Sequence, residues 1–229
     1  MNNTVVRNIH RADTDAIATL ERLGVSTVHE AQGRSGLMQP YMRPLWRGAR
    51  IAGSAVTALC HPGDNWMIHV ACDVVRRGDL LVVACSSENS DGAFGELLAT
   101  SLKALGVKGV VLDLGCRDAA DISGMKFPLW SRAISAKGTV KQSIGSVNLP
   151  VVCAGVNVKP GDVVVADDDG VVVVPRLDAA KVAKAGEERE QKEAGSRARL
   201  RKGELGLDIY DMRKSLADKG LKYIDGPLD

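Results

Sequence analysis

An arginine and an aspartate, Arg117 and Asp118, stand side by side shortly after the apolar run Gly109–Leu112. A planar guanidinium can hold a carboxylate or a keto oxygen, and a carboxylate can bind a hard cation. Neighbouring side chains of a strand point to opposite faces, so these two can reach one ligand only where the strand has ended. Gly115 marks the expected end, which predicts that both side chains turn toward one site. In the alternative interpretation, Asp118 caps the next helix and Arg117 is a solvated surface charge.

A glycine-rich segment is the second candidate, because Gly92 and Gly95 precede or open a predicted helix over Phe94–Leu105. The N–H groups in the first turn of a helix have no partner inside it and can bind an anion. Here they belong to Glu96, Leu97 and Leu98. Both candidate segments follow predicted strands, and ligands collect at the carboxyl ends of strands in open α/β sheets. The spacing of a Walker or dinucleotide loop is missing, so no phosphate cofactor is predicted.

Other catalytic patterns are less well supported. The four histidines form no zinc-binding pattern, and no GxSxG elbow indicates a serine nucleophile. Schiff-base chemistry on a lysine stays open. The acids Asp167–Asp169 could bind a cation, yet a tight turn ending at Gly170 between two valine-rich strands explains them better.

The composition narrows the class of protein. With 229 residues, 45% hydrophobic and 25% charged, the chain can bury a sizeable core in a single domain. A net charge of +2, from 30 basic and 28 acidic residues without a basic stripe, predicts no nucleic-acid partner. The five cysteines form no CxxC pair, which is typical of a reducing compartment. No apolar run has the length of a signal peptide or membrane span, so we expect a cytoplasmic protein with no membrane partner.

Strand and helix signals alternate through the first half of the chain. Predicted strands at Arg50–Leu59, Leu80–Ala84 and Gly109–Leu114 are separated by helices, which indicates a partly parallel, buried sheet. Short valine-rich runs then predict a strand-rich layer. From Leu177 the chain is helical and charged, with a last helix over Leu207–Gly220. We expect an α/β catalytic part over residues 1–176 and a helical arm over residues 177–229 that belongs to the same domain.

The charged helix has too few apolar residues to bury a face between Glu187 and Lys202. The simplest interpretation is a solvated helix with pairs one turn apart, such as Glu193 with Arg197. In an oligomer, the same helix could carry Glu193 into the cleft of a neighbouring copy, where a carboxylate beside a metal would act as an acid–base group.

Several segments together resemble one family of enzymes. They include GVSTVHEAQGR, HPGDNWMIHVA, DGAFGELLATSLKALGVKGVVLDLGCRD and GELGLDIYDMR. In these segments the chain is similar to the 4-hydroxy-4-methyl-2-oxoglutarate/4-carboxy-4-hydroxy-2-oxoadipate aldolases, whose wider family includes the regulator of ribonuclease E activity A. The resemblance runs from about Val5 to Tyr223. It implies a swivelling β/β/α domain with mixed, partly parallel sheets, assembled as trimers that pair into hexamers.

The resemblance also implies roles for individual residues. Asp118 matches the ligand of Mg²⁺ or Mn²⁺, and Arg117 matches the residue that binds the pyruvyl carbonyl. The substrate-binding segment matches Gly95, Glu96, Leu97 and Leu98, in which the N–H groups of the two leucines take the carboxylate. Glu96 stands where this family often has aspartate. Acids from an adjacent subunit match Glu30 and Glu193, with Glu190 as an alternative to Glu193.

The implied reaction is cleavage of a 2-oxo-4-hydroxy acid to pyruvate, in the degradation of aromatic acids. A metal at Asp118 polarises the keto group, and Arg117 shares the charge of the enolate that forms. A metal-activated water ordered by Glu30, Glu96 or Glu193 is the expected base. Oxaloacetate decarboxylation passes through the same enolate and is an expected side activity. The competing hypothesis is a binding protein without enzymatic activity, similar to the ribonuclease E inhibitor on the same scaffold.

Overall fold

Apolar runs of the sequence form the central strands of the molecule, in a computed structural model that describes residues 3–227. The chain divides into two compact units, Met1–Gly186 and Glu187–Asp229. In the first unit, parallel strands lie in the order β6-β5-β3-β2. They are β2 (Ile51–Cys60), β3 (Leu80–Cys85), β5 (Gly109–Cys116) and β6 (Leu129–Ile134). Nearly all residues of β2, β3 and β5 are buried, as expected for parallel strands covered on both faces.

The sheet continues beyond β2 with an antiparallel hairpin. Strand β10 (Val163–Asp167) pairs with β2 and with β11 (Gly170–Val174), and the hairpin closes between Asp167 and Gly170. Asp167 pairs directly with Gly170, so only Asp168 and Asp169 connect the two strands, which confirms the predicted tight turn. Shorter strands complete the first unit: β1 (Arg43–Pro44), β4 (Gly92–Phe94), β7 (Ser146–Val147), β8 (Val151–Cys153) and β9 (Val156–Val158).

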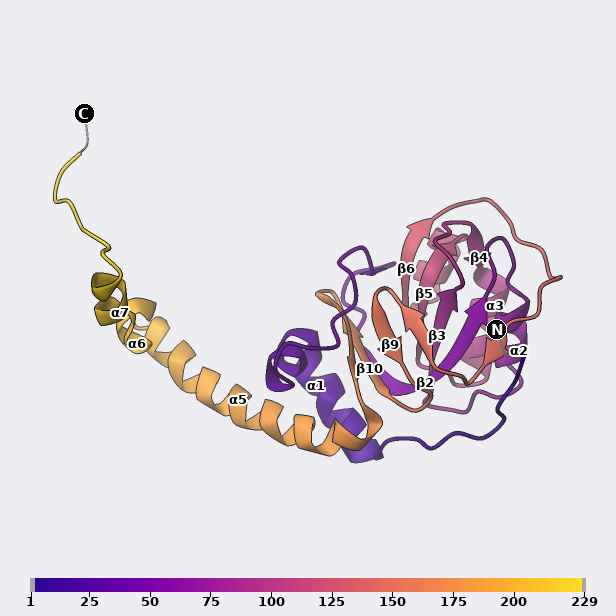
Figure 1. Cartoon of the computed structure of the whole chain (residues 1–229), viewed down its shortest axis with the longest axis horizontal. Coiled ribbons are helices and arrows are strands. Elements are labelled where there is room, and N and C mark those ends of the chain that lie inside the picture. Colours follow the sequence, from indigo (N-terminus) through magenta and orange to yellow (C-terminus); the bar gives the residue numbers. More distant parts are fainter. Residues whose placement is uncertain (1–2, 228–229) are drawn as a thin grey trace. The chain divides into compact units, whose positions relative to one another are not determined.

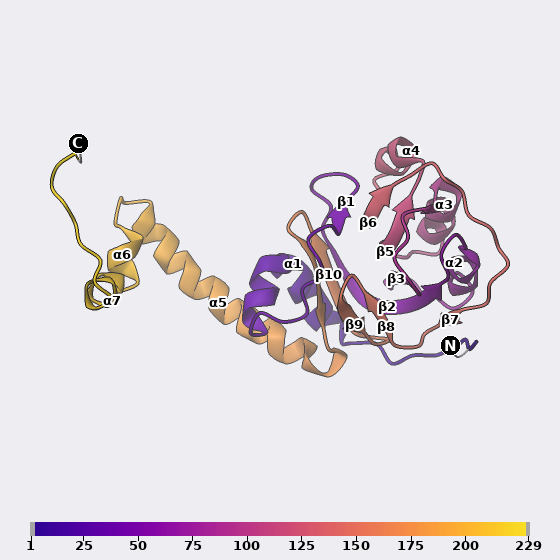
Figure 2. The ribbon, with the colours of Figure 1, turned by 45° about the horizontal axis from the view of Figure 1, so that its top comes forward.

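Helices cover the sheet on two sides (Figures 1 and 2). The helices α2 (Trp66–Ala71), α3 (Glu96–Ala104) and α4 (Ala119–Gly124) share one apolar core with β3 and β5. Helix α1 (Thr14–Ala31) packs on β10 and β11 instead, away from α3 in both views. Any residue of α1 is therefore separated by the sheet from the start of α3.

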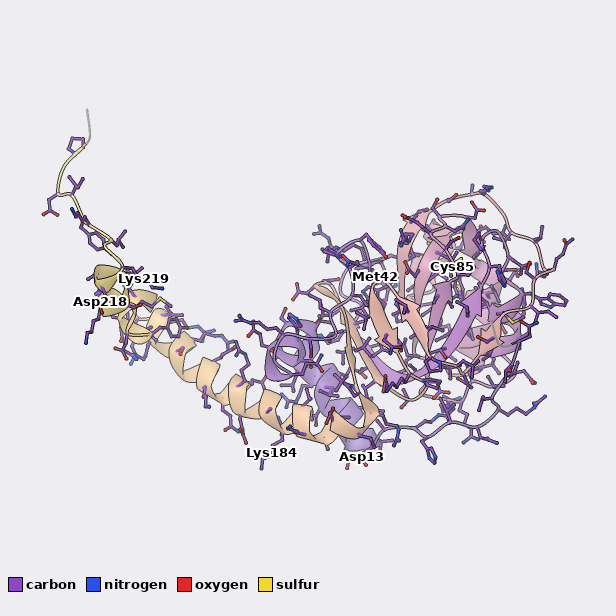
Figure 3. All side chains as sticks on the ribbon, in the orientation of Figure 1. Asp13, Met42, Cys85, Lys184, Asp218 and Lys219 are labelled. Atoms are coloured by element: carbon purple, nitrogen blue, oxygen red, sulfur yellow. The ribbon has the colours of Figure 1, made fainter. Side chains whose placement is uncertain are left out.

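Helix α1 has a defined start and a defined kink. The carboxylate of Asp13, labelled in Figure 3, accepts hydrogen bonds from the N–H groups of Asp15 and Ala16. Gly24 interrupts the helix at φ 79°, a conformation that favours glycine, and the next N–H group, of Val25, donates to Asp167 at 2.9 Å. The carboxylate of Asp167 at the hairpin tip thus accepts a hydrogen bond from the start of the second half of α1.

The second unit is helical and highly charged. Helix α5 (Ala179–Leu200), preceded by the 3₁₀ turn η1 (Arg176–Asp178), begins in the first unit and continues into the second. The last predicted helix is in fact two short ones, α6 (Gly206–Ile209) and α7 (Met212–Asp218), because Asp211 between them is left-handed at φ 51°. Figure 3 labels Asp218 and Lys219 at the end of α7.

The predicted fold class, α/β with a mixed, partly parallel sheet and C-terminal helices, is confirmed. All five cysteines are free. Within the described residues, no helix has the length and apolar character needed to cross a membrane.

Candidate active site

Strand β5 ends later than its glycine suggested. Gly115 and Cys116 remain paired with β6, after a register irregularity that begins at Leu112, so the strand ends one residue beyond Gly115 and before Arg117, as the convergence of the two side chains requires. The turn comes at Asp118, which has a left-handed backbone at φ 55°. This conformation is uncommon for a residue other than glycine, and it sets the direction in which the side chains leave the strand. Arg117 and Asp118 consequently lie on the same cavity wall, as predicted.

The carboxylate of Asp118 does not cap the helix that follows it. Asp118 is the N-cap residue of α4, but its side chain makes no capping hydrogen bond there. Its Oδ2 accepts instead from the N–H group of Glu96 at 3.0 Å, at the start of α3. The N–H group of Arg117 donates to the Phe94 carbonyl at 2.8 Å. These two bonds join the candidate segments that the sequence singled out separately.

Gly95 is required at this junction by space rather than by its backbone angles. A Cβ atom at this position would lie 2.5 Å from Oδ2 of Asp118 and 3.1 Å from Nε of Arg117. Its φ of −135° would suit any residue. The predicted helix over Phe94–Leu105 accordingly begins at Glu96, while Phe94 belongs to β4 beside β5.

The start of α3 provides free hydrogen-bond donors. The N–H group of Glu96 is taken by Asp118, whereas those of Leu97 and Leu98 have no acceptor within residues 3–227. The carboxylate of Glu96 accepts a hydrogen bond of 2.7 Å from the Thr100 hydroxyl one turn later. Two oriented donors next to a guanidinium form a binding place for a small carboxylate.

Three cavities meet at Asp118. The largest, about 610 Å³, is acidic, because Glu96 and Asp121 also line it. A second, about 330 Å³, lies between Arg117 and the end of β6. The third, about 130 Å³, is lined by Arg117 together with Gly95, Leu97 and Leu98. The carboxylates and the cationic groups therefore lie on different sides of Asp118.

The third cavity contains residues that the sequence analysis missed. They are Asn65, His69 and Lys141. Partial burial and the positive charge of Lys141 lower the pKa of His69 from its ordinary value, which favours the neutral ring. Asn65 follows the end of β2, so its position at a strand end was a usable signal. Lys141 lies in a segment without periodicity, and no pattern in the sequence could have placed it.

Two predicted acids lie elsewhere. Glu30 is on α1, on the other side of the sheet from α3, and pairs with Arg34 at 3.0 Å. Glu193 is on α5 in the second unit, where it pairs with Arg189 at 2.9 Å rather than with Arg197. Glu30 does not line the three cavities at Asp118. Glu30 therefore cannot reach the start of α3 within its own unit.

A divalent cation at Asp118 would have few protein ligands. No group of three or more His, Cys, Asp or Glu side chains is arranged to hold a metal ion in the described part of the chain. Oδ2 of Asp118 is engaged by Glu96, while its Oδ1 has no donor within the described residues. Mg²⁺ commonly binds one or two carboxylates and keeps several waters. One free carboxylate oxygen beside an open, acidic cavity fits such a hydrated cation.

A comparison with known protein families identifies the fold. A family model described as RraA-like (Aldolase/RraA) matches residues 13–173. The chain belongs to the RraA-like family. The matched region of this RraA-like chain contains Glu96, Arg117 and Asp118, as well as Glu30, but ends before Glu193.

Proteins similar to this chain include one named as an aldolase, one uncharacterised protein and one named as a ribonuclease inhibitor. A Halalkalibacterium halodurans protein, provisionally named a 4-hydroxy-4-methyl-2-oxoglutarate aldolase, is 28% identical over 166 residues, 72% of this chain and 79% of that protein. A crystal structure of an uncharacterised Pseudomonas syringae protein has a TM-score of 0.76 at 26% identity, over 89% of this chain and all of that one. Streptomyces coelicolor RraAS2, called an unusual member of the RNase ES inhibitor RraA protein family, has a TM-score of 0.73 at 30% identity, over 83% of this chain and 99% of its own.

Proposed function

We propose that this RraA-like protein is a divalent-metal-dependent aldolase that cleaves 2-oxo-4-hydroxy acids to pyruvate. The substrates are 4-carboxy-4-hydroxy-2-oxoadipate, which gives pyruvate and oxaloacetate, and 4-hydroxy-4-methyl-2-oxoglutarate, which gives two pyruvates. The observation that carries the proposal is the convergence of the Arg117 guanidinium, the Asp118 carboxylate and the free N–H groups of Leu97 and Leu98 around one cavity. The aldolase names of several relatives support it.

The residues of the third cavity bind the pyruvyl half of the substrate. The N–H groups of Leu97 and Leu98 donate to the C1 carboxylate, which benefits from the positive end of the α3 dipole. Arg117 donates to the 2-keto oxygen. As the C3–C4 bond breaks, negative charge moves onto that oxygen, and a fixed guanidinium stabilises the charge more than it stabilises the neutral ketone.

Asp118 would hold Mg²⁺ or Mn²⁺, with water completing the shell and Glu96 and Asp121 facing the same cavity. Such a cation would supply electrophilic activation of the keto group. Glu96, held by Thr100, orders the water that accepts the proton of the C4 hydroxyl. The same site releases CO₂ from oxaloacetate, because Arg117 and the α3 donors bind the same pyruvate enolate.

The complete site is proposed to be shared between copies of the chain in a trimer or hexamer. Glu30 and Glu193 each pair with an arginine one turn away in their own helix, and Glu30 does not line the cavities at Asp118. In this proposal, a neighbouring copy brings these acids to the water beside Asp118. The helical arm over residues 177–229 is proposed to pack on that neighbour.

The second candidate function is inhibition of a ribonuclease by protein binding, which the likeness to RraAS2 favours. Pyruvate release from 4-carboxy-4-hydroxy-2-oxoadipate, measured with Mg²⁺, with a chelator, and after metal is returned, separates the two. An aldolase loses pyruvate release in the chelator and regains it with Mg²⁺ or Mn²⁺. Absence of pyruvate release under all conditions would overturn the proposal in favour of the binding protein.

A further inference from the structure

Lys141 is an unpaired cation in the wall of the third cavity at Asp118. It lines this space of about 130 Å³ together with Arg117 and the start of α3. Across residues 3–227, no carboxylate lies within ion-pair distance of its amine. By contrast, Lys137 of the same loop pairs with Asp91 at 3.1 Å. An unpaired lysine beside an arginine and a helix N-terminus leaves the cavity with an excess of positive charge.

The backbone around Lys141 is fixed. The buried carboxylate of Asp64 accepts hydrogen bonds from the N–H groups of Gln142 at 2.6 Å and Ser143 at 2.8 Å. On the other side, the N–H group of Val140 donates to Gly63 at 2.9 Å. The lysine therefore extends from an anchored segment, so little backbone freedom is lost when its amine binds an anion.

Asn65 is a second sign that a ligand belongs in this cavity. Its side chain is 8% exposed and lines the cavity, and its Nδ2 donates to the Ala93 carbonyl at 2.8 Å. That bond fixes the orientation of the amide, because exchanging the two atoms would place Oδ1 against a carbonyl oxygen. Oδ1 is left as a buried acceptor without a donor. Such an atom is costly unless a ligand or an ordered water supplies a hydrogen bond.

We propose that Lys141 binds the distal carboxylate of the substrate and makes the site selective for dicarboxylates over monocarboxylates. This assignment rests on the proposed aldolase function. The N–H groups of Leu97 and Leu98 bind the C1 carboxylate, and Arg117 binds the keto oxygen. Lys141 is the remaining cation and binds the second carboxylate. The hydroxyl of the substrate, or a water bound with it, supplies the donor for Oδ1 of Asn65.

The test compares two unreactive five-carbon ligands, 2-oxoglutarate and 2-oxopentanoate, which differ by one carboxylate and lack the 4-hydroxyl group needed for cleavage. Calorimetry on the full chain with Mg²⁺ is expected to show 2-oxoglutarate binding about 10- to 100-fold more tightly, the usual value of a hydrogen bond between charged groups. Lys141→Met should remove this preference and leave the affinity for 2-oxopentanoate within about twofold. Lys141→Arg should keep it.

Lys137→Met is the matched control, because it removes one positive charge from the same loop and is expected to keep the preference for the dicarboxylate. Equal binding of both ligands by the wild type, equal weakening of both by Lys141→Met, or an identical loss in Lys137→Met would overturn the assignment. Selective binding without pyruvate release from any substrate would overturn the aldolase and leave a dicarboxylate site at Lys141. Pyruvate release with unselective binding would overturn the Lys141 assignment alone.

Discussion

Charged residues are held differently in two regions of the molecule. One region is the junction between the end of β5 and the start of α3, and the other is the second half of α5. At the junction, backbone geometry fixes the charges: Asp118 is left-handed, its carboxylate holds the N–H group of Glu96, and Gly95 leaves room for both. On α5, charges pair along the helix surface, as Arg189 does with Glu193. The first arrangement is specified within one chain. The second has the form of a solvated helix, and it gains a chemical role only if another molecule meets it.

Removal of the Asp118 carboxylate should have the largest effect on the first arrangement. Asp118→Ala deletes both the proposed metal ligand and the acceptor for Glu96, so kcat for pyruvate release is expected to fall by about 10³-fold or more. Asp168→Ala removes an exposed acid of the β10–β11 turn and should leave kcat unchanged. Full activity of Asp118→Ala, with or without chelator, would contradict the metal assignment.

Arg117→Lys tests whether the shape of the cation matters at the junction. A lysine keeps the charge but loses the planar pair of donors, and kcat/KM is expected to fall by about 10²-fold. Steady-state kinetics on 4-hydroxy-4-methyl-2-oxoglutarate would measure the loss. A near-normal kcat/KM would instead indicate that Arg117 is a solvated surface charge.

Gly95→Ala tests whether the junction needs the free space at this position, because the substitution adds a methyl group and changes no charge. The new methyl group would lie 2.5 Å from Oδ2 of Asp118, so the carboxylate must move, and kcat is expected to fall by about 10-fold to 10²-fold. Gly195→Ala on α5 is the control, since no atom lies within 4 Å of its added Cβ. That variant should keep kcat and unfold at an equal or higher temperature. Equal kinetics for the two variants would show that the junction tolerates displacement.

The smallest expected effect is a loss of folding stability in acid, when Asp64, which anchors the Lys141 loop, becomes protonated. Burial alone would raise the pKa of Asp64, but hydrogen bonds from Trp66, Gln142 and Ser143 outweigh it and bring the pKa below 3.8. A carboxyl whose folded pKa is depressed stabilises the fold above its unfolded value, and this contribution is lost as pH falls through the folded pKa. Unfolding measured from pH 7 to 2 should show a steeper loss below about pH 4 in the wild type than in Asp64→Asn. Identical slopes would contradict this account of the loop.

The sequence predicted the junction better than it predicted its details. Strand ends and a glycine-rich helix start are local signals, and they correctly brought Arg117, Asp118 and the start of α3 together. The strand end was predicted one residue early, at Gly115, because a glycine inside a strand can also mark an irregularity or a close contact. Here a Cβ on Gly115 would meet the Ser90 carbonyl at 2.1 Å. The left-handed turn at Asp118 has only a weak sequence signal, because aspartate adopts this conformation more readily than most residues but usually does not.

Residues far apart in the sequence were harder to find. Lys141 reaches the cavity because Asp64 binds the loop that carries it, a contact over 78 residues of sequence that no periodicity reveals. Asn65 was identifiable only as a residue after a strand. For Glu193 the sequence offers a charged helix and a resemblance, and the family match ends at residue 173. The role proposed for Glu193 depends on a neighbouring copy, which the sequence of one chain does not specify.

Mixed oligomers test most directly whether the two regions work together across copies of the chain. Glu193→Gln and Asp118→Ala subunits are each expected to be inactive, with Glu193→Gln reduced by about 10²-fold, the usual value of a lost acid–base group. After the two variants are mixed and subunit exchange is verified by native mass spectrometry, pyruvate release should return in part, because some sites combine Asp118 of one chain with Glu193 of another. Inactive variants that exchange freely and recover no pyruvate release would contradict a shared site. A Glu193→Gln protein with normal kcat would contradict it as well.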